Sequence, residues 1–170
     1  MAIMALGPEM TLKEIQFKLG TEQHRLIHLC EKGVIEPDFQ QTEGRGRWRR
    51  FSKRNLFEFA LALELRKYEM PVQFVGVCIR LMRSFEKSVQ KLDPKVQIPD
   101  SIIKGKFTLR IFDGEYLVFS IGSKVNLGFN LKKLLSGQAK QMKPEKMTKL
   151  PTDFSSQLEV NLSEIVKKLA

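Results

Sequence analysis

The spacing of apolar residues changes at Asp93-Pro94, and this change narrows the fold class of the chain. Before the dipeptide, apolar residues recur every three or four positions, which is typical of helices. After it, Phe107, Leu109 and Ile111 alternate with polar residues, which is typical of a strand. Helices followed by strands predict an α+β fold. We predict two domains, a mostly helical one over residues 1–92 and a small α+β domain for dimerisation or effector binding over residues 93–170.

Composition limits the classes of protein further. Hydrophobic residues make up 42% of the 170, enough for a folded core, so gross disorder is excluded. No apolar run reaches the roughly 18 residues of a membrane span, and residues 1–10 lack the features of a secretory signal. Only Cys30 and Cys78 occur, which predicts a reducing compartment, the cytoplasm. The net charge of +10 favours a polyanionic partner, with nucleic acid preferred to a membrane.

Two short helices are predicted at the start of the chain. Thr11 and Glu14 have the spacing of a capping box, and the helix that they begin should end at Gly20. Thr21 is the predicted cap of a second helix through about Lys32. In that helix Leu26 and Leu29 are predicted to face inward. Four polar residues are predicted to face solvent: Gln23, His24, Arg25 and His28. Two short helices meeting at a glycine are typical of a helix-turn-helix.

The most basic segment of the chain follows, between Gly44 and Arg54. It holds six basic residues and no acidic one: Arg45, Arg47, Arg49, Arg50, Lys53 and Arg54. We predict a β-hairpin, or wing, with its tip near Gly44–Gly46, and Trp48 among the arginines. The guanidinium group of arginine can donate two parallel hydrogen bonds to phosphate oxygens, and the indole of tryptophan can pack on a deoxyribose. The pattern therefore favours contact with DNA. The alternative is a solvated hairpin in which Trp48 anchors the core.

Two longer helices should follow the wing. Ser52 is the predicted cap of a strongly apolar helix from about Lys53 to Tyr68, which contains Leu56, Phe59, Ala60 and Leu63. Pro71 is placed to begin the next helix, which Asp93-Pro94 ends. That helix carries a heptad-like stripe of Val75, Cys78, Met82, Phe85, Val89 and Leu92. The stripe either packs within the chain or forms a dimer seam, and the apolar face of the 107–121 hairpin is the other candidate seam.

The second half should form a hairpin over residues 107–121. A two-residue Asp113-Gly114 turn and a three-residue turn through Glu115 predict registers that differ by one residue. We favour the longer turn, because it alone pairs apolar residues on one face: Ile111 with Leu117, Leu109 with Phe119, and Phe107 with Ile121. A strand over 125–129, a short helix capped by Asn130, an exposed linker over 138–151, a strand through 158–162 and a helix over 163–169 are expected next.

The first part of the chain resembles the MerR family of transcription regulators over roughly residues 11–90. The resemblance rests on residues at fixed spacing: Thr11–Ile15, Gly20, Leu26, Gly33–Ile35, Pro37, Arg47–Ser52 and Asn55-Leu56. It implies a winged helix-turn-helix that binds DNA and a regulator that distorts promoter DNA. Ile27 stands where the family has an arginine, and His28 and Leu29 occupy its two aromatic positions. The long dimerisation helix of the family is not visible, so the resemblance does not extend to the second half.

These observations predict a dimeric, sequence-specific regulator of transcription. Its partners would be double-stranded DNA, a second copy of the chain, and an unidentified small molecule or protein as effector. The predicted DNA-binding residues are Gln23, His24 and Arg25 as readers of base edges, His28 beside them, and Arg45, Arg47, Trp48, Arg49 and Arg50 in the wing.

Catalysis and metal binding are not expected. The sequence has no phosphate-binding glycine loop, nucleophile elbow or pair of catalytic carboxylates, so we predict neither enzyme activity nor a cofactor. His24 and His28 are spaced as metal ligands, but no third histidine exists and no cysteine follows Cys78. Two other functions stay open: an excisionase-like or architectural protein that bends DNA, and an adaptor whose basic wing binds an acidic protein.

Overall fold

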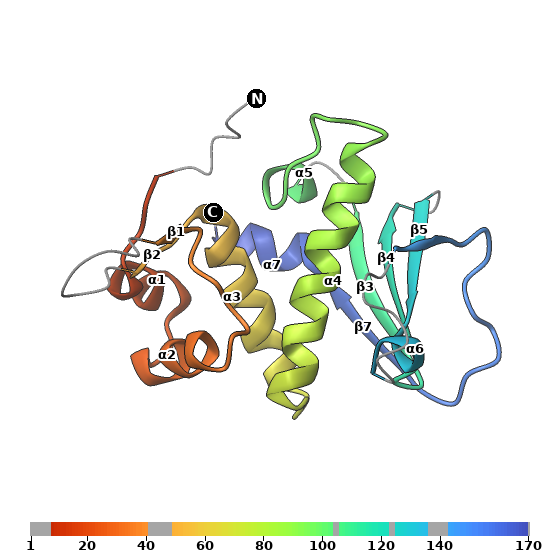
Figure 1. Ribbon diagram of the computed structural model, residues 1–170, viewed down its shortest axis with the longest axis horizontal. Coiled ribbons are helices and arrows are strands. Elements are labelled where there is room, and N and C mark those ends of the chain that lie inside the picture. Colours follow the sequence, from red (N-terminus) through yellow and green to blue (C-terminus); the bar gives the residue numbers. More distant parts are fainter. Residues whose placement is uncertain (1–7, 41–48, 104–105, 123–124, 136–142, 170) are drawn as a thin grey trace. The chain divides into compact units, whose positions relative to one another are not determined.

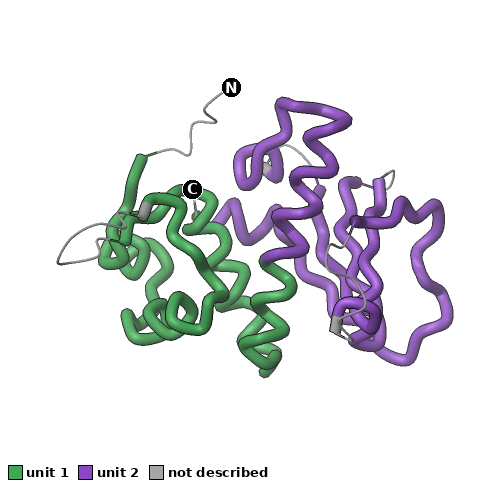
Figure 2. The backbone as a smooth tube through the Cα atoms, in the orientation of Figure 1, with its two compact units in different colours: residues 1–79, 169 green, residues 80–168, 170 purple. Residues whose placement is uncertain are grey.

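The computed structural model describes residues 8–40, 49–103, 106–122, 125–135 and 143–169. These residues form a mixed α+β fold with seven helices and a five-stranded antiparallel sheet (Figure 1). The chain divides into two compact units, residues 1–79 with Leu169 and residues 80–168 with Ala170 (Figure 2). The division falls inside helix α4, Val72–Gln90. The predicted domain boundary after residue 92 stays a prediction. None of the described helices has the length and apolar composition needed to cross a membrane.

Unit 1 begins with the two predicted helices, α1 (Leu12–Leu19) and α2 (Gln23–Glu31). The capping box is confirmed, because the Glu14 N–H donates to Thr11 Oγ1 at 3.2 Å and Glu14 Oε2 accepts from the Thr11 N–H at 2.6 Å. Gly20 ends α1 in the left-handed conformation, φ 59°, which favours glycine. The predicted cap of α2 is wrong by one residue. Glu22 occupies the cap position without a side-chain hydrogen bond.

A short ribbon and a third helix follow α2. Strands β1 (Phe39–Gln40) and β2 (Arg49–Arg50) pair antiparallel, and the predicted tip at residues 44–46 lies outside the described residues. Ser52 is confirmed as the cap of α3 (Lys53–Arg66), which ends two residues before the predicted Tyr68. Most of α3 is buried: Asn55, Leu56, Phe57, Glu58, Phe59, Leu61, Ala62 and Leu65. Of the four apolar residues named for this helix, Leu56 and Phe59 are buried, and Ala60 and Leu63 are half-buried.

Helix α4 carries the predicted apolar stripe through both units. Pro71 directly precedes the helix instead of lying in its first turn, and its carbonyl accepts from the Val75 N–H at 3.0 Å. The stripe is buried from Val75 to Val89. Leu92, its last predicted member, is 80% exposed because α4 ends at Gln90 and leaves Leu92 outside the helical face.

The sheet of unit 2 has the strand order β6-β5-β4-β3-β7. Its strands are β3 (Phe107–Phe112), β4 (Tyr116–Ile121), β5 (Val125–Asn130), β6 (Glu145–Lys146) and β7 (Gln157–Asn161). The three-residue turn between β3 and β4 is confirmed, with Ile111 opposite Leu117, Leu109 opposite Phe119 and Phe107 opposite Ile121. Strand β6 corrects the expected linker over 138–151, because residues 145 and 146 pair with Gly128 and Leu127 of β5.

The two candidate dimer seams pack on each other within one chain. Phe85 of α4 stacks on Phe119 of the hairpin with ring centroids 4.9 Å apart, and Phe119 meets Phe129 of β5 edge-on at 6.2 Å. Met82, Phe85 and Val89 are buried in this way, and so are Leu109 and Phe119. Neither surface is therefore available to a second copy of the chain.

Asparagine caps the two helices that follow strands in unit 2. Asn130 Oδ1 accepts from the Lys133 N–H at 3.3 Å at the start of α6 (Leu131–Leu135), as predicted. Asn161 Oδ1 accepts from the Glu164 N–H at 3.2 Å at the start of α7 (Leu162–Leu169). Strand β7 therefore ends before Leu162, and the helix begins one residue earlier than expected. The remaining helix is the short α5, Asp100–Ile103.

Candidate nucleic-acid interface

The polar residues predicted in α2 all lie at its surface. Gln23, His24, Arg25 and His28 are exposed, and Leu26 and Leu29 are buried, as expected. At about 100° per residue, His24 and His28 lie on one outward stripe, with Gln23 and Arg25 on its opposite flanks. The three predicted readers of sequence therefore spread over about 200° of the helix surface. They do not form one compact patch.

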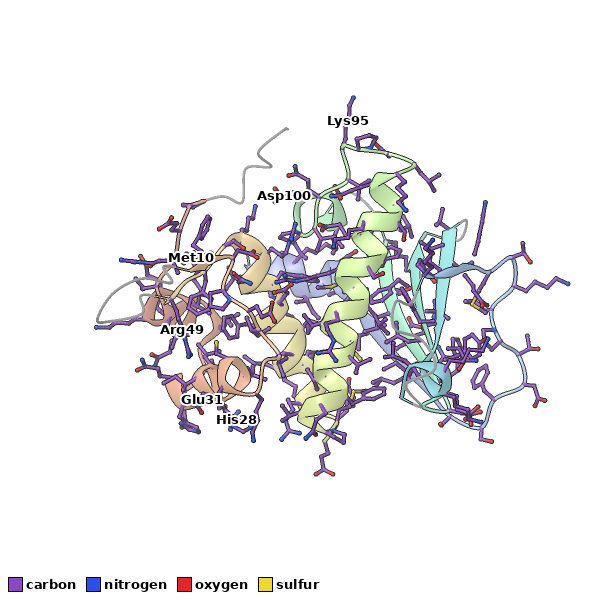
Figure 3. All side chains as sticks on the ribbon, viewed as in Figure 1. Met10, His28, Glu31, Arg49, Lys95 and Asp100 are labelled. Atoms are coloured by element: carbon purple, nitrogen blue, oxygen red, sulfur yellow. The ribbon has the colours of Figure 1, made fainter. Side chains whose placement is uncertain are left out.

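Acidic residues also lie on this surface, which the sequence interpretation did not consider. Glu22 Oε2 lies 3.4 Å from His24 Nε2, and both side chains are largely exposed. Glu31 follows His24 by seven residues, so it lies on the same stripe of α2. Figure 3 labels His28 and Glu31 near the end of α2. The exposed face of α2 is thus polar and of mixed charge, which suits discrimination between base edges better than uniform attraction to phosphate.

The ribbon places its two described arginines against different helices. Arg49 is exposed and lies beside the Cys30 thiol of α2, to which it donates a hydrogen bond. Cys30 follows Gln23 by seven residues, so Arg49 lies on the Gln23 flank of α2 and away from Arg25. Arg50 is half-buried, and its charge lowers the pKa of Glu14 in α1, together with the larger effect of the Thr11 hydrogen bonds. Arg49 is therefore brought to the predicted reading helix, whereas the charge of Arg50 acts on Glu14 of α1.

The other predicted wing residues, Arg45, Arg47 and Trp48, lie outside the described residues. The described end of the ribbon is attached to two other parts of unit 1. Met10 bridges Phe51 in antiparallel fashion, with N–H to carbonyl distances of 2.8 and 2.9 Å. The Phe51 ring meets Phe59 of α3 edge-on at 5.3 Å. The end of β2 is thus fixed to the chain before α1 and to the core of unit 1.

A buried polar network joins both ends of the ribbon to α3. Asn55 is fully buried, and its Oδ1 accepts from the N–H groups of Asp38 at 2.9 Å and Ser52 at 3.1 Å. Its Nδ2 donates to the Glu36 carbonyl at 2.9 Å and to Glu58 Oε2 at 3.0 Å. The Ser52 hydroxyl also donates to the Asp38 carboxylate. Residues 36–38 precede β1 and Ser52 follows β2, so this network attaches both ends of the ribbon to α3. The sequence signal was the Ser52-x-x-Asn55 cap, whose wider role was missed.

The two cysteines are protonated at neutral pH. Burial raises the pKa of the Cys30 thiol to about 11, which the charge and hydrogen bond of Arg49 partly oppose. Burial raises the pKa of Cys78 to about 12. In the described part of the chain, no group of three or more His, Cys, Asp or Glu side chains is placed to hold a metal ion.

The Cys30 thiol offers a test of the Arg49 contact. We expect iodoacetamide to alkylate Cys30 about 100-fold more slowly in the folded protein than in the urea-unfolded chain, because a pKa rise from 9.0 to about 11 lowers the thiolate fraction by that factor. Arg49→Ala should slow the reaction further, since it removes a charge that stabilises the thiolate. Peptide mass spectrometry measures the rate at Cys30 separately from Cys78. Arg25→Ala is the matched control on the opposite flank and should leave the rate unchanged. Faster alkylation in the Arg49 variant would contradict the contact.

Comparison with models of known protein families finds none that matches this chain, and a search of curated proteins finds no relative.

Proposed function

We propose that the chain is a sequence-specific DNA-binding regulator of transcription, cytoplasmic and without enzyme activity. The observation that carries the proposal is the exposed polar face of α2 with Arg49 of the ribbon beside it. The chain's net charge of +10 supplies the general attraction to a polyanion. Residues 11–66 contain helix, glycine turn, helix, ribbon and helix in the order of a winged helix-turn-helix, which supports that interpretation of unit 1.

In this proposal α2 enters the major groove, which is wide enough for a helix. Residues in its first turn, Gln23, His24 and Arg25, contact base edges. Because Gln23 and Arg25 lie on opposite flanks, they contact different base pairs or different strands. His28 lies one turn further along the stripe of His24. Arg49, with Arg45, Arg47 and Trp48 of the wing, holds the phosphate backbone on the Gln23 side.

The acidic residues of α2 belong in the proposal. Glu22 and Glu31 would be repelled by phosphate, so α2 would approach the bases in an orientation that keeps these carboxylates away from the backbone. Glutamate can also accept a hydrogen bond from the amino group of cytosine in the major groove. Such contacts lower affinity for random DNA more than affinity for one preferred site.

A homodimer is part of the proposal, because one recognition helix reads only a few base pairs and a symmetric pair doubles the site. The apolar face of α4 is packed on the hairpin, so the seam lies on another surface. Unit 2 remains the proposed dimerisation or effector module.

The experiment that tests the function is selection of bound fragments from a random duplex pool with the full chain. We expect an inverted repeat, since a two-fold protein dimer reads two equivalent half-sites. Recovery of bent or A·T-rich fragments without a consensus would support the excisionase-like or architectural alternative. Failure to retain any duplex at moderate salt would refute DNA binding and support the adaptor that binds an acidic protein.

Arg25 offers a prediction on specificity. Arg25→Ala should cost about 1–3 kcal/mol on the selected site and little on random DNA, if the guanidinium makes a bidentate base contact. Arg25→Lys is the matched control, because it keeps the charge and loses the fork. Competition binding with both duplexes measures the two losses. If Arg25→Lys binds the selected site as tightly as the wild type, Arg25 acts only as a charge.

A further inference from the structure

One face of the sheet in unit 2 holds a row of polar residues, and we call it the polar face although Val118 and Phe112 also lie on it. Thr108 lies opposite Ser120, and Ser120 lies opposite Asn126, so these three residues form a row across β3, β4 and β5. Arg110 lies two residues after Thr108, on the same face. Phe119 belongs to the other face, where it stacks on Phe85 of α4. The polar row is therefore on the side of the sheet away from this ring stack.

A segment of the chain crosses the polar face. Strands β6 and β7 lie at opposite edges of the sheet, so the residues that connect them, 147–156, must pass over one face (Figure 1). We call these residues the strap. Met147 occupies the space above Gly128, where a Cβ atom would lie only 2.4 Å from the Met147 sulfur. Near the other end of the strap, the Phe154 ring meets Phe112 edge-on at 4.9 Å.

The strap is also fixed by hydrogen bonds to the β3–β4 turn. The N–H groups of Ser155 and Ser156 donate to Asp113 Oδ1 at 2.9 and 2.7 Å. Both ends of the strap are thus held against the sheet. Between them, a hollow of about 420 Å³ opens on the polar face, a volume within the range of small-molecule sites. Its lining residues are Lys106, Thr108, Arg110, Gly122, Asn126 and Leu150.

Two side chains that line this hollow have polar groups that no described residue partners. Thr108 is 3% exposed and Asn126 is 8% exposed. The Asn126 Oδ1 accepts from the Ser120 hydroxyl at 2.6 Å, but its Nδ2 donates to no described residue. The hydroxyl of Thr108 likewise has no hydrogen bond within the described residues. The lining of the hollow thus holds one hydroxyl and one amide donor that no described residue uses.

The charge of the hollow is positive. Lys106 is exposed and forms no ion pair with the described residues. Arg110 donates from Nε to Glu159 Oε2 at 2.8 Å and from Nη1 to Ser120 Oγ at 3.3 Å, and no described residue accepts from its Nη2. Glu159 offsets one of the two positive charges, so Lys106, Arg110 and Glu159 together carry a net charge of +1.

The geometry points to this hollow as a binding site for a small organic anion. A carboxylate or phosphate group would accept from Lys106, the free Arg110 nitrogen and Asn126 Nδ2, since charged acceptors make the stronger hydrogen bonds. Thr108 can donate to the anion or to a polar group beside it, and Leu150 gives the ligand an apolar wall. This inference does not depend on DNA binding, because every residue it uses belongs to unit 2.

Titration of the ¹⁵N-labelled full chain at constant ionic strength tests the site. The probes are inorganic phosphate, citrate and, as a neutral control, glycerol. We expect phosphate, citrate or both to cause saturable shifts of the backbone amides that line the hollow, and glycerol to cause none. Saturation by citrate alone identifies a carboxylate site, and saturation by phosphate alone identifies a phosphate site. The absence of saturable shifts with both anions, or saturable shifts confined to other parts of the chain, would overturn the inference.

Variants separate the site from general charge. Lys106→Ala should weaken binding about tenfold, the effect of losing one charge-assisted hydrogen bond, and should leave the fold intact because Lys106 is exposed. Lys95→Ala removes an exposed lysine of the same unit outside the hollow and should leave the affinity unchanged. Asn126→Asp keeps the acceptor for Ser120 and replaces the donor with a negative charge, so it should abolish binding. Equal affinities in the Lys106 and Lys95 variants would show that the hollow does not select the anion.

Discussion

Replacement of Asn55 by alanine should lower the free energy of unfolding by about 3–4 kcal/mol. The side chain is fully buried and makes five hydrogen bonds: with the N–H groups of Asp38 and Ser52, the Ser52 hydroxyl, the Glu36 carbonyl and the Glu58 carboxylate. Alanine would leave these buried or half-buried groups without that partner. Each such group costs about 1–3 kcal/mol, and partial rearrangement around the site reduces the sum.

Urea unfolding followed by circular dichroism measures this loss, and Asn130→Ala is the matched control. Asn130 makes one capping hydrogen bond, at 3.3 Å, so the same substitution there should cost only about 1 kcal/mol. Equal losses in the two variants would mean that the network around Asn55 adds nothing beyond an ordinary helix cap. A larger loss at Asn55 would support a wing that is held at both ends.

The second large effect concerns DNA affinity. Changing Arg47 and Arg49 together to alanine should reduce the slope of log K against log salt by about 2, since each lost phosphate contact removes about 0.9. At 0.15 M salt this corresponds to an affinity lower by roughly 30-fold. The loss should be similar on the selected site and on random duplex, because phosphate contacts carry no sequence information.

Fluorescence anisotropy at several salt concentrations gives both the slope and the affinity. The matched control is Lys91→Ala with Lys95→Ala, which removes the same charge from exposed positions of unit 2. This control should change the slope little, because long-range attraction is screened at moderate salt. If the Arg47/Arg49 variant keeps the salt slope and affinity of the wild type, the wing does not touch DNA.

Local rules explain which elements the sequence predicts well. Thr11, Ser52 and Asn130 each cap a helix as expected, because a cap depends on residues within one turn. The β3–β4 register follows from face matching: the shorter turn would place Leu109 opposite Val118, so the apolar residues of the two strands would no longer share one face. The cap of α2 was misplaced at Thr21 because Glu22 takes the cap position without any side-chain hydrogen bond.

Other features depend on contacts between distant segments, which a pattern does not specify. The stripe of α4 was correctly predicted as apolar, but only the stacking of Phe85 on Phe119 identifies what it packs against. Strand β6 has two exposed residues, so no alternation marks it, and it forms through backbone pairing with β5. The exposed residues of α2 follow from helical periodicity. The position of Arg49 beside Cys30 requires the tertiary fold.

Strand β6 bears on how the protein avoids aggregation. An uncovered edge strand can pair with the same strand of another molecule, and such pairing can propagate. Here β6 covers Leu127 and Gly128 in the middle of the β5 edge, and its own two residues, Glu145 and Lys146, are charged and exposed. The opposite edge, β7, presents exposed Gln157 and Glu159. A foreign strand would have to displace β6 before it could extend the sheet at β5, and displacement would separate Met147 from Gly128. The contact between Met147 and Gly128 therefore also opposes edge-to-edge polymerisation of the sheet.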